Sequence, residues 1–213
     1  MATEQEKDWA GAFGDEYSAR NSATKEAQLN AEVFWFKALR KSNSFWPQSF
    51  HPSINRVLEL GAGAGINLAA LRTLLPHAKM HGIEINQRAF AELEKVADQA
   101  TCCSIFDYTT PAPDFDLVFT KGVLIHIAPA DLPRAYEVLY RASKRYILVA
   151  EYYNPTPVEV FYRGREERLY KRDFAGEMLA AYPDLHLVDY GFHYHLDLAP
   201  QDDINWFLLG KTA

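Results

Sequence analysis

The stretch "RVLELGAGAGINLAAL", from Arg56 to Leu71, places three glycines at alternate positions between an apolar run and a helix-forming run. The first run is typical of a buried strand, and the second is typical of a helix. A turn this tight has two explanations. Either the glycines let a nucleotide-like ligand approach the backbone, or they let the strand pack closely against the helix.

The chain alternates strand and helix signals after Asn55. Apolar strand candidates are "AKMHGIEIN", "ATCCSIFDY", "FDLVFTKG" and "RYILVAEY", and helix-like segments precede most of them. This alternation predicts parallel strands joined by crossovers, with helices on both faces of the sheet. The last two strand candidates, "LHLVDYGFHYH" and "INWFLLGK", are separated by only about eight residues, which suits antiparallel neighbours. We therefore expect an α/β fold with a Rossmann-like, mostly parallel sheet that ends in an antiparallel strand.

Residues 1–50 differ from the rest of the chain because they show helical spacing without strand signals. In "SATKEAQLNAEVFWFKALRKS" the large apolar residues are spaced in a way compatible with one helical face. These residues are Leu29, Val33, Phe34, Phe36 and Leu39. We expect residues 1–50 to form a helical extension or lid over a core domain of residues 51–213.

The composition narrows the class of protein. With 213 residues, 48% of them hydrophobic, the chain can bury one substantial core, and its net charge of -6 argues against a nucleic-acid surface. The two cysteines, Cys102 and Cys103, are neighbours, so they suit neither a disulfide nor a zinc site, and we expect no metal. The chain starts with polar residues and has no long apolar run, so we expect a cytoplasmic protein, monomeric or homodimeric, that binds neither nucleic acid nor membrane.

The spacing of the glycines separates two classes of ligand. In an open parallel sheet, ligands bind beyond the carboxyl ends of the strands, where the first strand-to-helix turn lies. Gly61, Gly63 and Gly65 occupy that turn. A dinucleotide fold requires the third glycine three positions after the second, whereas here it comes after two and Ile66 fills the dinucleotide position. The spacing therefore disfavours a nicotinamide dinucleotide.

An acidic residue at the end of the second strand is the next test for a ribose-containing ligand. Glu84 in "HGIEIN" has that position, and its two carboxylate oxygens can accept hydrogen bonds from both hydroxyls of a ribose. The alternative is an ordinary acid at a strand end. After the third strand, Ser104 or Asp107 is a candidate for the exocyclic amine of an adenine, or a cap of a turn. The apolar candidates for the two faces of the adenine ring are Ile85, Ile105 and Phe106.

Several motifs of the sequence, taken together, resemble those of a known enzyme family. "VLELGAGAG", "GIEIN" and "FDLVFTKGVLIHI", in this order and spacing, resemble the class I S-adenosylmethionine-dependent methyltransferases over about residues 50–211. More narrowly, "FTKGVLIHI", "EYYNPTPVEV", "YRG", "KRDFAGEML" and "PQDDINWFLLGK" resemble the methylases associated with pseudaminic acid biosynthesis, a bacterial sugar-modification context. The resemblance implies the class I methyltransferase fold and S-adenosylmethionine as cofactor.

The resemblance also implies roles for single residues. Glu59 and the backbone from Gly61 to Gly65 would surround the methionine part of the cofactor, and Glu84 would hold its ribose. Pocket residues near the sulfonium would be Thr120, Lys121 and Gly122. Candidates in the N-terminal extension to close over the cofactor are Tyr17, Arg20 and Asn21. Arg20 either pairs with the cofactor carboxylate or is an exposed helix charge.

Candidate residues that would bind or activate the acceptor of the methyl group come from three parts of the sequence. His126 in "VLIHIAP" is either a base that faces the pocket or a structural histidine that holds its loop. In "GFHYH", alternation puts His193 and His195 on one face, both partly buried or both exposed, and Tyr194 on the other as a candidate substrate contact.

The segment from Glu151 to Phe174 follows the fifth strand, so we expect it to lie over the pocket. Its aromatic residues supply flat walls with hydroxyl tips, of which Tyr152 and Tyr153 are catalytic candidates and Tyr153 and Tyr162 are substrate-binding candidates. Arg163 is either a surface charge or the group that binds a carboxylate or phosphate of the substrate.

We therefore expect a methyltransferase that acts on the oxygen or nitrogen of a small, anionic metabolite, a sugar or an amino-acid-like molecule. The alternatives are a non-catalytic sensor or scaffold of the same fold and a nicotinamide-dependent oxidoreductase.

Overall fold

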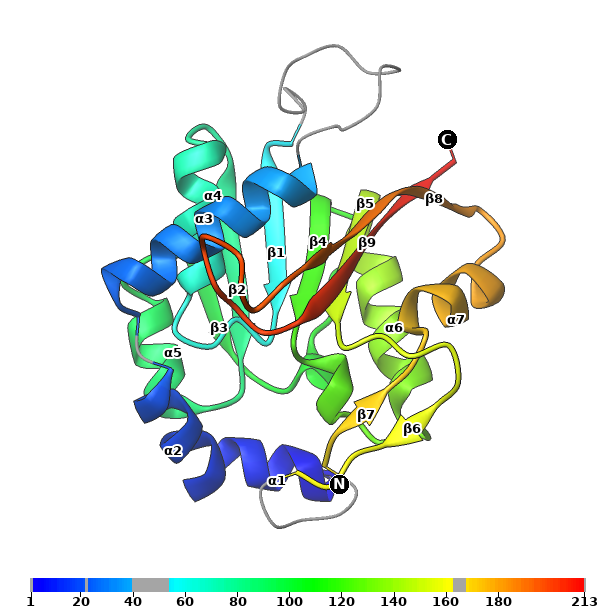
Figure 1. Ribbon diagram of the computed structural model, residues 1–213. Coiled ribbons are helices and arrows are strands. Elements are labelled where there is room, and N and C mark those ends of the chain that lie inside the picture. Colours follow the sequence, from blue (N-terminus) through cyan, green and yellow to red (C-terminus); the bar gives the residue numbers. More distant parts are fainter. Residues whose placement is uncertain (1, 22, 40–53, 163–167, 213) are drawn as a thin grey trace.

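The computed structural model describes residues 2–21, 23–39, 54–162 and 168–212. Within these residues, seven strands form one sheet in the order β3-β2-β1-β4-β5-β9-β8, and two short strands form a separate pair (Figure 1). The strands are β1 (Arg56–Leu60), β2 (Lys79–Glu84), β3 (Gln99–Cys102), β4 (Phe115–Lys121), β5 (Ser143–Glu151), β6 (Val158–Glu159), β7 (Tyr170–Lys171), β8 (Leu185–His193) and β9 (Ile204–Lys211). The α-helices are α1 (Glu4–Ala10), α2 (Ala12–Arg20), α3 (Lys25–Leu39), α4 (Ile66–Leu74), α5 (Gln87–Leu93), α6 (Leu132–Ala142) and α7 (Phe174–Ala181). Two short 3₁₀ helices are η1 (Ile105–Asp107) and η2 (Leu124–His126).

The sheet has the expected mixture of directions. Strand β1 pairs in parallel with β2 on one side and with β4 on the other, while β9 runs antiparallel between β5 and β8. The expected Rossmann-like fold with an antiparallel strand near its end is therefore confirmed. Because the chain crosses from β1 to β2 and later returns to β4, the strand order reverses beside β1, which is where such sheets bind ligands.

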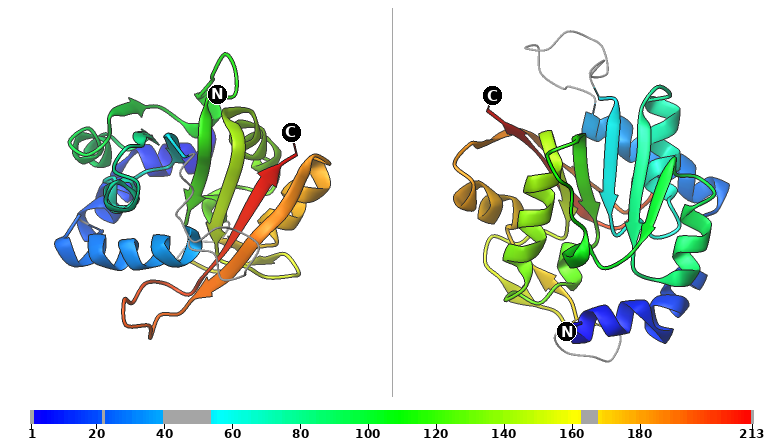
Figure 2. Two further views of the ribbon diagram at one scale, coloured as in Figure 1. Left: turned by 90° about the horizontal axis from the view of Figure 1, so that it is seen from above. Right: turned by 180° about the vertical axis from the view of Figure 1, so that it is seen from behind.

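Helices cover both faces of the sheet (Figure 2). On one face the core includes side chains of α3, α4 and α5, and on the other it includes those of α6 and α7. Residues such as Val57 and Leu58 are adjacent in β1 but belong to opposite cores, because successive strand residues point to opposite faces. Burial on both faces explains why the parallel strands are almost continuously apolar.

Helix α3 buries a different face from the one expected. Phe34 and Leu39 are buried as expected, whereas Leu29, Val33 and Phe36 are exposed to between 37% and 51%. The buried face is centred on Trp35, whose ring lies 4.5 Å from that of Phe119 in β4. Ala31 and Ala38 complete this face, since small side chains let the helix approach its neighbours closely. The spacing of the large apolar residues alone therefore predicted a helix face that only partly coincides with the buried one.

Helices α1 and α2 lie along the edge at which the parallel strands end (Figure 1). The assignment of residues 1–50 to a separate extension stays a prediction, because the expected boundary falls within residues 40–53, outside the described residues. Among the described residues, none of the helices combines the length and the apolar character that crossing a bilayer requires.

Candidate active site

A cavity of about 420 Å³ lies at the carboxyl ends of the parallel strands. Its size falls within the range of about 300–1,000 Å³ that is usual for small-molecule sites. The walls come from the turn after β1, the ends of β2 and β4, the segment around η1, the loop between β8 and β9, and the N-terminal helices. The cavity therefore occupies the crevice that the topology predicts.

Gly63 opens the turn after β1 toward the cavity. Its φ of 53° is in the left-handed region, and a Cβ built on it would meet no atom within 4 Å. Its N–H donates to Oε2 of Glu84 at 2.8 Å. The backbone at Gly63 is thus accessible to a ligand and is fixed by the carboxylate at the end of β2.

Gly65 has another reason to be glycine. It caps α4 with a φ of 78°, and a Cβ there would lie 2.4 Å from Cγ2 of Val96. Gly61 and Gly63 line the cavity, whereas Gly65, also expected to contact the cofactor, does not. Close packing therefore explains Gly65, whereas Gly63 is open toward the cavity and its contact with a ligand stays a prediction.

Glu84 is buried at the cavity wall. Its Oε1 accepts a hydrogen bond from the N–H of Asn86 at 2.8 Å, and burial raises the pKa of the carboxyl. Each carboxylate oxygen has a second lone pair, so both can still accept a hydroxyl hydrogen from a ligand. Ile85 lines the same wall.

The segment after β3 forms the far end of the cavity. Ser104, Ile105 and Phe106 line it, whereas Asp107 does not. The Ser104 hydroxyl accepts from the N–H of Phe106 at 3.2 Å and so caps η1. The Phe106 ring is held in place by Arg134, whose guanidinium carbon lies 4.3 Å from the ring centroid.

Glu59 and Thr120 are buried behind the cavity wall and do not line it. Glu59 Oε1 accepts from Nδ2 of Asn67 at 2.7 Å, and it is Asn67 that lines the cavity. Oε2 of Glu59 has no hydrogen-bond partner among the described residues, and burial raises the pKa of this carboxyl to about 8. Glu59 therefore does not face the cavity itself but fixes the side chain of Asn67, which does.

Lys121 is the one lysine or arginine among the described residues that lines the cavity. Its Nζ donates to Oε1 of Gln201 at 2.7 Å, and burial lowers the pKa of its ammonium group. From the N-terminal helices, Tyr17 and Asn21 line the cavity but Arg20 does not. Arg20 lies 3.7 Å from Glu16 on its own helix, with 41% of its side chain exposed, so it is a surface charge.

His126 lies in η2 and lines the cavity. Its Nδ1 is 2.7 Å from the carbonyl oxygen of Arg168, and its ring packs against Trp9 at 4.9 Å and Tyr162 at 5.3 Å. Burial lowers the pKa of the imidazole to about 4, so His126 is neutral near pH 7. The alternatives of base and structural histidine are not exclusive, because the ring is fixed at one nitrogen only.

Glu151 holds the turn that carries His126. At the end of β5 its carboxylate accepts hydrogen bonds from the N–H groups of Val123, Leu124 and Ile125, at 3.0–3.3 Å. Burial raises the pKa of Glu151 to about 7. This buried carboxylate was not among the expected site residues, although it begins the segment expected to cover the pocket.

Two consecutive tyrosines after β5 have different surroundings. The Tyr152 hydroxyl donates to Oδ2 of Asp202 at 2.7 Å, and Asp202 lines the cavity. Tyr153 packs against Phe207, is 37% exposed and does not line the cavity. Arg163 lies outside the described residues.

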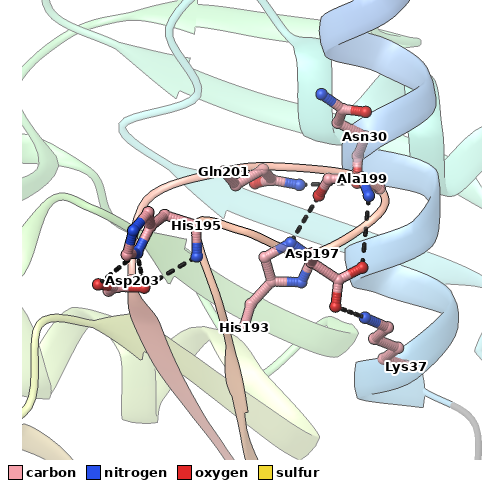
Figure 3. Close-up of polar contacts among 8 residues, drawn as sticks. All are labelled: Asn30, Lys37, His193, His195, Asp197, Ala199, Gln201 and Asp203. Carbon is pink, nitrogen blue, oxygen red and sulfur yellow. Dashed lines mark hydrogen bonds and ion pairs between the residues drawn. The ribbon is translucent and has the colours of Figure 1, made fainter.

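The loop of residues 194–203 ties the end of the sheet to α3 (Figure 3). Gln201 Nε2 donates to the carbonyl of Asn30 at 2.7 Å, and Asp197 pairs with Lys37. Contrary to the expectation of matching exposure, His193 is buried and His195 is exposed, because β8 ends at His193 and the alternation stops there. Tyr194 is 44% exposed and does not line the cavity.

Residues 57–145 match the family model described as a methyltransferase domain. These residues are similar to a methyltransferase domain over 89 of the 213 positions of the chain. This match and the fold confirm the expected class I methyltransferase, an enzyme that uses S-adenosylmethionine as its cofactor. The narrower family associated with pseudaminic acid biosynthesis stays a prediction. No curated protein matches the chain by sequence.

Solved structures of methyltransferases share the fold at low sequence identity. One is 1,6-didemethyltoxoflavin-N1-methyltransferase from Burkholderia thailandensis, with a TM-score of 0.69, 14% identity and coverage of 100% of this chain and 92% of that chain. Another is magnesium protoporphyrin IX methyltransferase from Synechocystis, with a TM-score of 0.66, 12% identity and 99% of each chain covered. A methyltransferase from Leishmania major has a TM-score of 0.66 and 16% identity, with 98% of this chain and 87% of that chain covered.

Several cavity residues of the methyltransferase domain and its flanking segments were not expected. Trp9 and Gln5 belong to α1, where no motif marks them, and Asn86 lies two positions after Glu84. Gln201 and Asp202 lie in "PQDDINW", which the resemblance had already singled out without a role. The run of polar residues before the last strand was the feature of the sequence that could have indicated Gln201 and Asp202 as cavity residues.

Replacing the glycines one at a time distinguishes cofactor contact from packing. In Gly63→Ala the new Cβ points into the cavity, so we expect binding of S-adenosylhomocysteine to be lost while the left-handed backbone costs only about 1–2 kcal/mol of stability. In Gly65→Ala the Cβ meets Val96, so the stability loss should be larger, about 2–4 kcal/mol. Calorimetry and urea unfolding of both variants test this, and equal losses of stability would contradict it.

Proposed function

We propose that this protein transfers a methyl group from S-adenosylmethionine to a hydroxyl or amino group of a small metabolite. The observation that carries the proposal is the Gly63–Glu84 pair at the strand ends: an open backbone beside a buried carboxylate with free lone pairs. These residues fit a nucleoside with a flexible tail, since the cavity continues from them toward Ser104–Phe106 on one side and Lys121 on the other.

Residues of this chain account for each part of the cofactor. Glu84 accepts hydrogen bonds from the ribose hydroxyls, and Ile85 with Ser104–Phe106 encloses the adenine. Because Lys121 lines the cavity and Arg20 does not, we assign the cofactor carboxylate to Lys121 in place of Arg20. Tyr17 and Asn21 cover the cofactor from α2.

When bound, the cofactor supplies a methyl group on a positively charged sulfur. A hydroxyl that accepts this methyl must lose its proton, and His126 has one nitrogen left to receive it. The pKa of about 4 makes His126 a weak base, but the proton becomes acidic as the oxygen forms its new bond. A neutral amine would need mainly positioning.

The acceptor lies beside His126, between α1 and the segment that follows β5. Tyr152 stays protonated because burial and Asp202 raise its pKa, and it fixes the Asp202 carboxylate at the cavity wall. Asp202 accepts hydrogen bonds, which favours a metabolite with hydroxyl or amino groups, as in a sugar or an amino-acid-like molecule. An anionic group on the metabolite stays a prediction, since it depends on Arg163.

The experiment is methyl transfer from labelled S-adenosylmethionine to a panel of anionic, neutral and cationic hydroxy and amino metabolites, with S-adenosylhomocysteine and NAD binding measured in parallel. We expect S-adenosylhomocysteine to bind and label to reach at least one acceptor. Binding of S-adenosylhomocysteine without any labelled acceptor, in the panel or in cell extract, would favour the non-catalytic sensor. Binding of NAD alone would favour the oxidoreductase.

A further inference from the structure

An ion pair connects α1 to the segment that orients His126. Arg168 Nε donates to Oδ2 of Asp8 at 2.8 Å, although 160 positions separate the two residues. Only 22% and 25% of the two side chains are exposed. The contact joins α1 to the start of the β7 segment, which lies beside it in Figure 1. Arg168 is therefore in contact with the N-terminal helix through its side chain.

The backbone of the same residue fixes the tautomer of His126. A carbonyl oxygen only accepts hydrogen bonds, so the 2.7 Å contact requires the hydrogen of the neutral imidazole to be on Nδ1. Nε2 then carries the lone pair, and it has no hydrogen-bond partner among the described residues. In the other tautomer, Nε2 would carry a hydrogen and could not accept a proton.

Trp9, the residue after Asp8 in α1, contacts the His126 ring directly. Trp9 packs on the His126 ring at 4.9 Å, and Tyr162 packs on it at 5.3 Å. Asn86, the N-cap of α5, holds the same turn of α1, because its Nδ2 donates to the Trp9 carbonyl at 3.2 Å. Helix α1 thus contacts both the His126 ring, through Trp9, and the residue whose carbonyl bonds that ring, through the Asp8–Arg168 pair.

We propose that Asp8 and Arg168 are positioning residues that make His126 a proton acceptor only when α1 covers the cavity. The proposal rests on the proposed function in taking His126 as the acceptor of a proton. Its consequence is that methyl transfer is restricted to the covered cavity, in which water is excluded. A partly exposed ion pair contributes little to overall stability, so its loss should affect the histidine more than the fold.

The tautomer of His126 can be observed directly by nitrogen NMR of the full chain labelled with ¹⁵N-histidine, with His126→Gln to assign its signal. In the wild-type protein we expect a neutral imidazole with its hydrogen on Nδ1. In Asp8→Asn we expect signals of both tautomers, while Asp8→Glu should restore the wild-type spectrum. The matched control is Glu4→Gln, which removes the exposed Glu4–Lys7 pair of the same helix and should leave His126 unchanged.

The outcomes separate this proposal from the proposed function. A wild-type His126 signal in Asp8→Asn, or the same change in Glu4→Gln, would overturn the proposal whatever the enzyme methylates, because the spectrum requires no substrate. Once an acceptor is known, Asp8→Asn should lower kcat with KM and the unfolding midpoint unchanged. If the His126 tautomer changes in Asp8→Asn but the protein transfers no methyl group, only the proposed function is contradicted.

Discussion

Glu84→Ala is expected to weaken binding of S-adenosylhomocysteine about 100-fold or more. The substitution removes two charge-assisted hydrogen bonds to a ribose, together worth about 3 kcal/mol, which corresponds to this change in the dissociation constant. It also frees the N–H of Gly63, so the turn after β1 loses the contact that fixes it. Calorimetric titration of S-adenosylhomocysteine into the variant measures the effect.

A graded and a matched control accompany this variant. Glu84→Gln keeps one acceptor oxygen, so its affinity should fall between those of the wild type and Glu84→Ala. Glu94→Ala changes an exposed acid at the end of α5, so its affinity should match the wild type. Wild-type affinity in Glu84→Ala, with the protein folded, would remove Glu84 from the cofactor site.

His126→Gln is expected to lower kcat for a hydroxyl acceptor about 100-fold, near the lower end of the range for general acid–base catalysis because the base is weak. Glutamine can still donate a hydrogen bond to the Arg168 carbonyl, so the turn should keep its position. Cofactor affinity should be unchanged, since the residues assigned to the cofactor lie outside η2. Single-turnover kinetics with labelled S-adenosylmethionine, once the acceptor is known, measure the change.

The pH dependence distinguishes a buried His126 from an exposed one. Burial disfavours the imidazolium, so the active neutral form persists as the pH falls and is lost only near the pKa of about 4. The wild-type rate should therefore show no fall near the ordinary histidine pKa of about 6.5. His77→Gln, on the surface, should leave rate and profile unchanged. An activity in His126→Gln equal to the wild type would assign His126 a structural role.

Neighbouring residues made much of the fold predictable. The strand β1, the glycine turn and α4 follow one another within 19 residues, so local periodicity and turn chemistry were enough to place them. Glu84 was predictable because β2 pairs with β1 in parallel, which brings its end to the same edge as the turn. The antiparallel closing strand followed from the short link before it.

The other residues of the candidate site were less predictable, because their contacts join segments that are distant in the sequence. Arg20 and Lys121 are both cations in sequence, and only packing shows that Lys121 reaches the cavity. Tyr152 and Tyr153 are chemically alike, but consecutive residues after a strand point in different directions, and only Tyr152 meets Asp202.

The sequence by itself indicated the class of sheet and the place of the ligand edge, because these depend on spacing within and between neighbouring elements, and its resemblance to a family implied the type of cofactor. The tertiary structure decided that Gly63 faces the cavity while Gly65 serves packing, and that the Arg168 carbonyl orients His126 from 42 positions away. These contacts depend on which side chains fill the space between elements. That packing depends on the whole core, and no local pattern records it.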